Sequence, residues 1–503
     1  MKIIPNARAA SVLALMFACL LALSSPPVTD ARMKVAPAGQ TLPEWTVMVF
    51  MDGDNNLEPF ALSDFEEMAR VSDSSQVNVV VQLDRIDGWS RDYDDWKHTL
   101  RFKVRHKMTP TPANALSPSE SGLAAGQELN MGHPDTLSSF VSWARNKYPA
   151  KRYLLVIWDH GDGWRKLHTV SAQQEIPAQT RLLRAVEAAA DDAAADKAAA
   201  NNPASKSFRK SRRRTRTQEV ARVPVTSLLD ATHRAISMDD TDRDRLYMRE
   251  VQSTLESSIG NQRLDIIGFD ACLMAMVENG FAMRRVADVM VGSEELEPGD
   301  GWQYDDWLPQ LISNPTMDAR ALGSVLVESY KKTYTTDPEK MTPRTTLSAI
   351  DLSQGKMAAL AQVVSDLGDE LIASLDTELS NIRIARESCK AYAPGDGYHG
   401  IDLQRFVEQL AARTTRPSLR DRAQAVLQML NGTSLIVNNY AGAARQGDFG
   451  SRGIAIYFPK SKTLYASDPY GDAYHDDNRD YEVEFVTQHK WDNFLHAFFA
   501  RVP

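Results

Sequence analysis

Four segments of this 503-residue chain consist almost entirely of apolar, often β-branched residues, and this feature limits the fold more than any other. They are WTVMVFMD (45–52), VNVVVQLD (77–84), RYLLVIWDHG (152–161) and LDIIGFDAC (264–272). Segments with helical spacing lie between them, for example 136–148 and 246–258. A strand without polar alternation is buried on both faces, as in parallel sheets covered by helices. We therefore expect an α/β fold with a mostly parallel sheet flanked by helices.

The N-terminus has the pattern of an export signal. Lys2 and Arg8 precede an apolar segment at 9–23, which is short for a membrane span and typical of a signal-peptide core. We expect residues 1–24 to be a signal peptide and 25–43 a leader. This predicts a secreted or periplasmic protein without a membrane span after signal removal; an uncleaved anchor is the alternative. A lipid anchor at Cys19 is disfavoured, because Met16 and Phe17 before it fit a lipobox poorly.

Composition divides the rest of the chain. Residues 44–314 carry the α/β pattern, interrupted at 165–222 by the stretches AVEAAADDAAADKAAA and SFRKSRRRTR. These stretches lack the apolar periodicity that a core needs, so we expect a flexible basic insertion. Residues 315–503 mix helical and strand patterns. We expect them to form an additional C-terminal α+β unit packed on the first domain.

Charge and cysteine content narrow the function. The net charge of −9 and the pI of about 5.7 argue against nucleic acid as a partner. Without the signal peptide, Cys272 and Cys389 remain; two cysteines do not make a disulfide scaffold, although these two could pair with one another. Cys389 is expected to be an ordinary thiol. A lone exported thiol is a liability unless its chemistry is used, and this directs attention to Cys272.

A histidine and a cysteine stand at the ends of two predicted strands. His160 ends YLLVIWDH and is followed by Gly161, and Cys272 ends LDIIGFDAC. Sites in open α/β sheets form at the carboxyl ends of strands, and a thiol beside an imidazole is the minimum for thiol-based acyl transfer. Backbone N–H groups at such turns can receive an oxyanion. The simpler alternatives are a core cysteine and a hydrogen-bonded loop histidine.

Four motifs resemble those of a known family. WTVMVFMDGDNNLE, YLLVIWDHGDGW, LDIIGFDACLMAMVE and SEELEPGDGWQYDDWL occur in this order, and AIYFP follows at 455–459. Together they resemble the clostripain family of cysteine peptidases, which is related in fold to caspases, gingipains and legumains. The resemblance implies a caspase-like sheet, Cys272 as nucleophile and His160 as general base and acid. It also implies the backbone N–H groups of Gly161 and Cys272 as oxyanion donors, and a dyad that needs no third orienting residue.

The resemblance also implies a substrate-binding role for Asp270. Clostripain-like enzymes prefer Arg or Lys before the scissile bond, and Asp270 matches the position suspected of binding that cation. Positions two apart in a strand face the same side, so Asp270 and Cys272 can share a cleft. The run EELEPGD at 294–300 could supply a wall of the pocket, and Arg would gain more than Lys from a bidentate contact. The alternative is that Asp270 caps a nearby backbone turn.

The chemistry requires no cofactor, but calcium stays open because some relatives need it. DGDNNLE has an Asp-x-Asp-x-Asn pattern at Asp52, Asp54 and Asn56. Leu57 stands where an EF-hand needs glycine, and Ser63 where it needs glutamate. A turn and a helix N-cap explain the motif better, and any calcium would use other ligands.

The insertion suggests self-activation. It carries a series of basic residues between His160 and Cys272, namely Lys206, Arg209, Lys210, Arg212, Arg213, Arg214 and Arg216. An enzyme that cuts after Arg or Lys would find a substrate there. Clostripain-like precursors are activated by internal cleavage in a comparable interval. We predict autocatalytic cleavage within 206–216; the alternative is a solvated linker, cut by other proteases or not at all.

These features predict a secreted cysteine endopeptidase, made as a zymogen, whose partners are proteins or peptides with Arg or Lys before the scissile bond. The alternative is a non-catalytic surface or binding protein that retains the fold. A degenerate relative would be expected to lose His160 or Cys272, and both are present. His399, in the glycine-rich turn GDGYHGIDL, could line the cleft from the C-terminal unit, but it is given no role.

Overall fold

A computed structural model describes residues 41–164, 236–394, 398–468, 474 and 483–502. The described residues form one compact unit. The expected signal peptide, most of the leader, the insertion at 165–222 and its basic residues at 206–216 lie outside the described residues. No helix in the described part of the chain has the length and apolarity that a membrane span requires.

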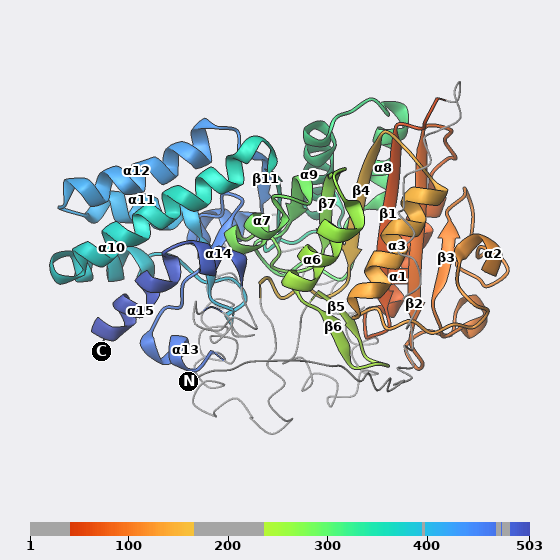
Figure 1. Cartoon of the computed structure of the whole chain (residues 1–503), viewed down its shortest axis with the longest axis horizontal. Helices are drawn as coiled ribbons and strands as arrows, with labels where there is room; N and C mark the ends of the chain where they lie inside the picture. The colour runs from red at the N-terminus through yellow and green to blue at the C-terminus, as the bar shows by residue number, and fades with distance from the viewer. Residues whose placement is uncertain (1–40, 165–235, 395–397, 469–473, 475–482, 503) are drawn as a thin grey trace, which may run out of the picture. The chain divides into compact units, whose positions relative to one another are not determined.

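The centre of the structure is an eight-stranded sheet in the order β11-β9-β8-β7-β4-β1-β2-β3 (Figure 1). The five strands β8, β7, β4, β1 and β2 run parallel to one another. At one edge β3 runs antiparallel to β2; at the other, β9 runs antiparallel to β8, and β11 runs antiparallel to β9. The mostly parallel α/β sheet is therefore confirmed. The strands are β1 (Trp45–Gly53), β2 (Val77–Arg85), β3 (Leu100–Lys103), β4 (Arg152–Trp158), β7 (Leu264–Asp270), β8 (Ala287–Gly292), β9 (Thr346–Asp351) and β11 (Ile436–Ala441).

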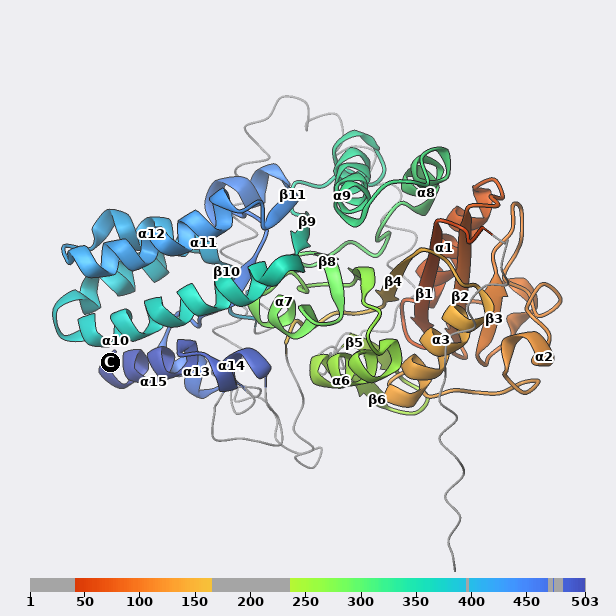
Figure 2. The ribbon, with the colours of Figure 1, turned by 45° about the horizontal axis from the view of Figure 1, so that its top comes forward.

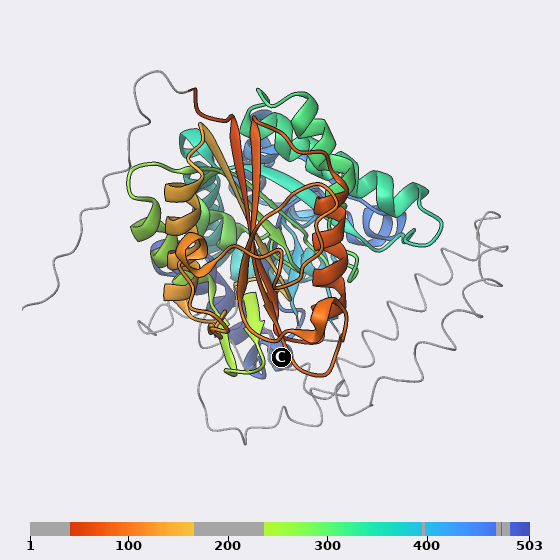
Figure 3. The ribbon, with the colours of Figure 1, turned by 90° about the vertical axis from the view of Figure 1, so that its right-hand side faces the viewer.

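Helices cover both faces of this sheet, as the edge-on view in Figure 3 shows. One face carries α1 (Glu58–Arg70), α8 (Tyr304–Ser313) and α9 (Ala319–Thr336), and the other carries α3 (Pro134–Lys147), α6 (Met248–Ile259) and α7 (Val277–Met283). Side chains of β1 alternate between two cores: Val47 and Val49 pack in one, Met48 and Phe50 in the other. Burial on both faces explains why these strands are almost continuously apolar.

The C-terminal part combines helices and strands, as expected. Four helices pack together away from the main sheet (Figure 2): α10 (Lys356–Glu387), α11 (Leu403–Arg413), α12 (Pro417–Gly432) and α15 (Trp491–Arg501). β10 (Gly400–Asp402) pairs with β12 (Ala455–Tyr457) in a small sheet, whereas β9 and β11 join the main sheet. The expected boundary between 314 and 315 therefore separates segments that share one sheet.

Short elements complete the fold. β5 (Ile236–Asp239) and β6 (Asp244–Leu246) form a hairpin beyond the carboxyl end of β1. The remaining helices are α2 (Pro118–Ser121), α13 (Lys462–Ala466) and α14 (Glu484–Gln488), with single turns at Tyr93–Asp95, Ser353–Gly355 and Arg445–Phe449.

The segment around Cys272 differs from the expected strand. The strand expected over 264–272 ends at Asp270, and the next helix begins only at Val277. Between them Leu273 has φ of +66°, a left-handed conformation that costs an L side chain of this size about 1–3 kcal/mol. A helix cannot continue through such a residue, so Cys272 lies in a sharp turn rather than in a regular element.

Candidate active site

His160 and Cys272 follow neighbouring parallel strands. Trp158 of β4 lies opposite Asp270 of β7, and the N–H of Asp159 donates to the Asp270 carbonyl at 3.3 Å. Both residues therefore leave the same edge of the sheet, as the sequence predicted. The backbones of the two turns touch: a methyl group built on Gly161 would lie 2.1 Å from the carbonyl oxygen and 2.6 Å from the nitrogen of Cys272. Gly161 is therefore required by close packing.

The loop after β8 holds the cysteine turn in place. The N–H of Leu273 donates to the Glu295 carbonyl at 3.2 Å, which supports the left-handed backbone at this position. The N–H of Glu297 donates to Cys272 Sγ at 3.2 Å. The same sulfur lies 3.9 Å from the Glu297 carbonyl oxygen, so the Glu297 backbone offers a donor to a thiolate and an acceptor to a thiol. Cys272 itself is half-buried.

His160 has a partner that the sequence did not predict. The ring is buried, and its Nε2 lies 2.7 Å from Oδ1 of Asn56, in the loop after β1. An amide oxygen only accepts hydrogen bonds, so Nε2 carries the hydrogen and Nδ1 is the nitrogen left to exchange a proton. β1 is the sheet neighbour of β4, so the loops after these strands meet at one edge. Loops that follow neighbouring parallel strands meet at the carboxyl ends of those strands, and this rule could have identified Asn56 as a neighbour of His160.

Asp270 lies buried beside a backbone turn. Its carboxylate accepts from the N–H of Trp302 at 3.1 Å and from the hydroxyl of Tyr304 at 2.9 Å. Gly301, with φ of +45°, packs against the carboxylate so closely that a Cβ there would lie 2.7 Å from Oδ1. Burial raises the pKa of Asp270 to about 7. These contacts match the alternative in which Asp270 caps a turn, and its role in substrate binding stays a prediction.

A second acid, Glu297, lies next to Asp270. Both of its carboxylate oxygens are buried, and its carboxyl group lies within reach of the Asp270 carboxyl and the Trp302 indole. Burial, followed by the negative charge of Asp270, raises the pKa of Glu297 well above its usual range. Glu297 lies within the 294–300 run that was expected to form a pocket wall. Its backbone contacts the Cys272 sulfur, and its carboxyl group interacts with that of Asp270.

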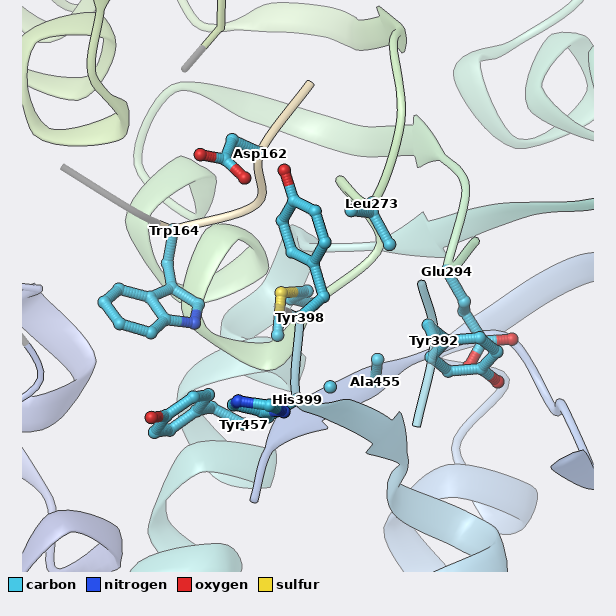
Figure 4. Close-up of a pocket in the computed structure, with 11 residues that line it drawn as sticks. Asp162, Trp164, Leu273, Glu294, Tyr392, Tyr398, His399, Ala455 and Tyr457 are labelled. Atoms are coloured by element: carbon cyan, nitrogen blue, oxygen red, sulfur yellow. The ribbon is translucent and has the colours of Figure 1, made fainter. Parts of the chain in front are cut away.

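A small pocket lies beside Leu273, the residue that follows Cys272 (Figure 4). Asp162 and Trp164 line it from the loop after β4, and Leu273 from the turn after Cys272. The C-terminal part contributes His399 and Tyr457, whose rings lie side by side with centroids 6.4 Å apart. The C-terminal unit thus reaches the residues next to the expected dyad. His399 lines this pocket, and its role stays unassigned.

The two described cysteines are both free thiols, so they do not pair with one another. Cys389 is buried in the C-terminal helices, where its Sγ donates to the Ala385 carbonyl at 3.4 Å. Burial raises the pKa of Cys389 to about 12. A thiol that keeps its proton is a poor nucleophile, in agreement with the ordinary structural role expected for it.

The residues of the DGDNNLE motif separate in space. Asn56 contacts His160, Asp52 accepts from Ser237 Oγ at 2.7 Å, and Asp54 lies beside Asp84 and Asp239. The motif therefore does not wrap around a single ion as an EF-hand loop does. Within the described residues, Asp54, Asp84 and Asp239 form a group that could hold a metal ion.

Comparison with known proteins places the chain in a class and a family. The clostripain family model matches residues 49–176 and 227–498. Clostripain of Hathewaya histolytica is 27% identical over 270 residues, which are 52% of this chain and 40% of clostripain. The chain thus matches less than half the length of this curated relative.

Two solved structures share the fold. A secreted C11 cysteine protease from Bacteroides thetaiotaomicron, in complex with an irreversible peptide inhibitor, has a TM-score of 0.50 and 17% identity, and the match covers 85% of this chain and 99% of that one. An inactive zymogen C11 protease from Parabacteroides distasonis has a TM-score of 0.52 and 14% identity, covering 91% and 99%. These two likenesses define the class of fold, a mostly parallel α/β sheet flanked by helices. Within that class, the chain belongs to the clostripain family.

Proposed function

We propose that this protein is a secreted cysteine endopeptidase that hydrolyses peptide bonds after Arg or Lys through His160 and Cys272. The observation that carries the proposal is the backbone contact between the turns of Gly161 and Cys272, at the carboxyl ends of β4 and β7. The N–H of Glu297, 3.2 Å from the sulfur, offers a donor to a thiolate at this position.

In the proposed mechanism, Cys272 passes its proton to Nδ1 of His160, and the thiolate attacks the carbonyl carbon of the substrate. The backbone N–H groups of Gly161 and Cys272 receive the oxyanion that develops. The imidazolium then protonates the leaving amine, and the C–N bond breaks to leave a thioester. Water attacks the thioester while His160 accepts its proton. The carboxylic acid product departs as the proton returns to the sulfur.

The acids beside the cysteine support a cationic substrate side chain. Asp270 and Glu297 are close enough for their carboxyl groups to interact, and the charge of Asp270 helps to raise the pKa of Glu297. An Arg or Lys side chain entering beside Cys272 would supply donors and positive charge to this pair. We propose that both acids, rather than Asp270 alone, select the residue before the scissile bond.

Secretion and self-activation rest on the sequence and on relatives. One C11 relative is described as secreted and another as an inactive zymogen. The apolar segment at 9–23 supports export, and the basic residues at 206–216 supply bonds that the proposed specificity would cut. The resulting light chain would carry His160 and the heavy chain Cys272.

A set of peptides that differ only at the residue before the scissile bond tests the specificity. Arg, Lys and citrulline are compared, because citrulline keeps the shape of Arg without its charge. Wild type is expected to cleave both the Arg and the Lys peptide, and to cleave the citrulline peptide at least about 100-fold more slowly than the Arg peptide. The Cys389→Ala variant is expected to cleave each peptide at the wild-type rate. Equal rates on citrulline would contradict the charged pocket. Failure to cleave any peptide, together with no labelling by an irreversible peptide inhibitor, would favour the non-catalytic alternative.

Self-activation is tested by intact mass of the precursor and its Cys272→Ala variant, incubated with and without calcium. Wild type is expected to split after a basic residue in 206–216, and the variant to stay whole until active enzyme is added. If both proteins split alike on their own, another protease makes the cut. If neither splits, the basic segment is a linker.

A further inference from the structure

The loop at 293–297, which follows β8, holds the turn that carries Cys272 at two points. The Glu295 carbonyl accepts from the N–H of Leu273 at 3.2 Å, directly after the cysteine. The N–H of Glu297 reaches the Cys272 sulfur at 3.2 Å. A displacement of this loop would therefore move both the backbone and the sulfur of the expected nucleophile.

The loop is attached in turn to the C-terminal part of the chain. The side chain of Glu295 is buried: its Oε2 lies 2.6 Å from a guanidinium nitrogen of Arg445, and its Oε1 accepts from the N–H of Ala393 at 3.1 Å. The neighbouring Glu294, also buried, accepts from the N–H of Gly453 at 3.0 Å. Two consecutive side chains of the loop thus bind to the C-terminal part.

Arg445 is held firmly in its own turn. This turn, Arg445–Phe449, follows β11, which ends at the same sheet edge as β8 because β9 runs antiparallel to both. Its Nε–H donates to the Arg344 carbonyl at 3.2 Å, and its guanidinium lies 4.2 Å from the centroid of the Phe449 ring. Only 13% of the side chain is exposed. A guanidinium fixed by a carbonyl and a ring is a rigid point of attachment for Glu295.

The ion pair restricts the Glu295 backbone as well as its side chain. Charged groups in contact with little water around them interact strongly and with strict geometry. Removal of the guanidinium would leave a buried negative charge without the cation that faces it, and such a side chain tends to move toward water. Because the Glu295 carbonyl belongs to the same residue, that movement would draw it away from Leu273.

We propose that Arg445 is a positioning residue for catalysis, which fixes the loop at 293–297 through Glu295 and thereby holds Cys272 in place beside His160. This gives the C-terminal part of the chain a task in the reaction that does not require it to touch the substrate. The inference rests on the proposed function, in which Cys272 is the nucleophile.

The test compares Arg445→Met and Arg445→Lys with wild type on the Arg peptide. The kcat value is expressed per thiol labelled at completion by an irreversible peptide inhibitor. A small displacement of the nucleophile is expected to lower kcat of Arg445→Met about 10–100-fold and to change KM less than about threefold. Arg445→Lys keeps the charge that faces Glu295 and is expected to restore kcat to within about fivefold of wild type. Equal kcat in Arg445→Met and wild type would overturn the proposal.

Arg284→Met is the matched control. Arg284 is also 13% exposed, and it pairs with Glu484 at 2.8 Å, away from the loop at 293–297. Both methionine variants are expected to lower the unfolding temperature by a few degrees, because each leaves a glutamate without its counter-charge. Only Arg445→Met is expected to lower kcat. An equal loss of kcat in both variants would assign the effect to general stability and contradict the proposal.

A double variant separates folding from positioning. Arg445→Met combined with Glu295→Gln removes both charges and keeps an amide oxygen for the N–H of Ala393. Its unfolding temperature is expected to return toward that of wild type, since no buried charge is left uncompensated. Its kcat is expected to stay at least about tenfold low, since no polar contact then joins the two side chains. Recovery of kcat together with stability would contradict a positioning role. Failure of the proposed function is seen separately, as absence of cleavage by wild type, and would overturn this inference with it.

Discussion

His160 Nε2 lies 2.7 Å from Oδ1 of Asn56, a residue 104 positions earlier in the chain. The contact orients the imidazole so that Nδ1, not Nε2, is left for proton exchange. A dyad without an orienting residue was expected from the family resemblance. The structure adds a neutral hydrogen-bond acceptor on Nε2, which can orient the ring as the aspartate of serine proteases does from Nδ1.

Replacing Asn56 tests this orientation. Asn56→Ala is expected to lower kcat about tenfold with little change in KM, because the ring loses a fixed position but no substrate contact. Asn56→Asp should raise the pKa of the imidazole and move the acidic limb of the kcat/KM profile to higher pH. Steady-state rates across pH measure both effects. An unchanged kcat in Asn56→Ala would show that the contact does not matter.

Gly161 is expected to tolerate no side chain. Gly161→Ala places a Cβ 2.1 Å from the Cys272 carbonyl oxygen, so the backbone of one of the two turns must move. A displacement of this kind is expected to reduce kcat at least about 100-fold while the protein stays folded. The matched control is Gly432→Ala at the end of α12, where a Cβ meets nothing within 4 Å. Activity and circular dichroism are measured on both variants.

The two acids beside Cys272 are expected to act on specificity. Asp270→Asn and Glu297→Gln should each lower kcat/KM for an Arg peptide about 10–1,000-fold and change that for a citrulline peptide much less. A loss of the same size on both peptides would assign the acids to structure and not to selection.

The pKa of Asp270 also predicts a stability change with pH. Burial raises the pKa to about 7 in the folded state, against a usual value of 3.8, so the folded state holds this proton after the unfolded state has lost it. This group therefore lowers the free energy of unfolding as pH rises from about 4 to 7. Asp270→Asn removes the group and should flatten the fall. Denaturant unfolding of both proteins at pH 4, 5.5 and 7 measures how the free energy of unfolding changes with pH. The same change with pH in both proteins would contradict a buried Asp270 with a raised pKa.

Glu484 makes the opposite prediction. Burial acts to raise its pKa, but hydrogen bonds from Arg284 and Arg285, at 2.7–2.9 Å, outweigh it and lower the pKa to about 2. This stabilisation is present above the usual value of 4.5 and is lost as pH falls toward 2. Glu484→Gln should therefore lower the unfolding temperature by a few degrees at pH 7 and have a smaller effect near pH 3. An equal effect at both pH values would contradict the ion pairs that hold α14 to the end of α7.

Much of the fold could be predicted because its signals are local. The apolar segments seen in the sequence coincide with strands β1, β2, β4 and β7. A strand covered on both faces needs apolar residues at almost every position, so the sequence shows it directly. The same reasoning located His160 and Cys272 at one sheet edge. It failed at Leu273, because a left-handed backbone held by the Glu295 carbonyl leaves no mark in the apolar spacing.

By itself, then, the sequence determined the class of fold, the two strand ends that carry thiol and imidazole, and the family. Only the tertiary structure decided which side chains join them. Asn56 reaches His160, Glu297 reaches Cys272 and Asp239 reaches Asp84 across long stretches of chain. Such contacts are made by loops after strands, and a loop's path depends on the elements that it packs against rather than on its own residues. Periodicity predicts strands and helices, but it carries no information about where two distant loops meet.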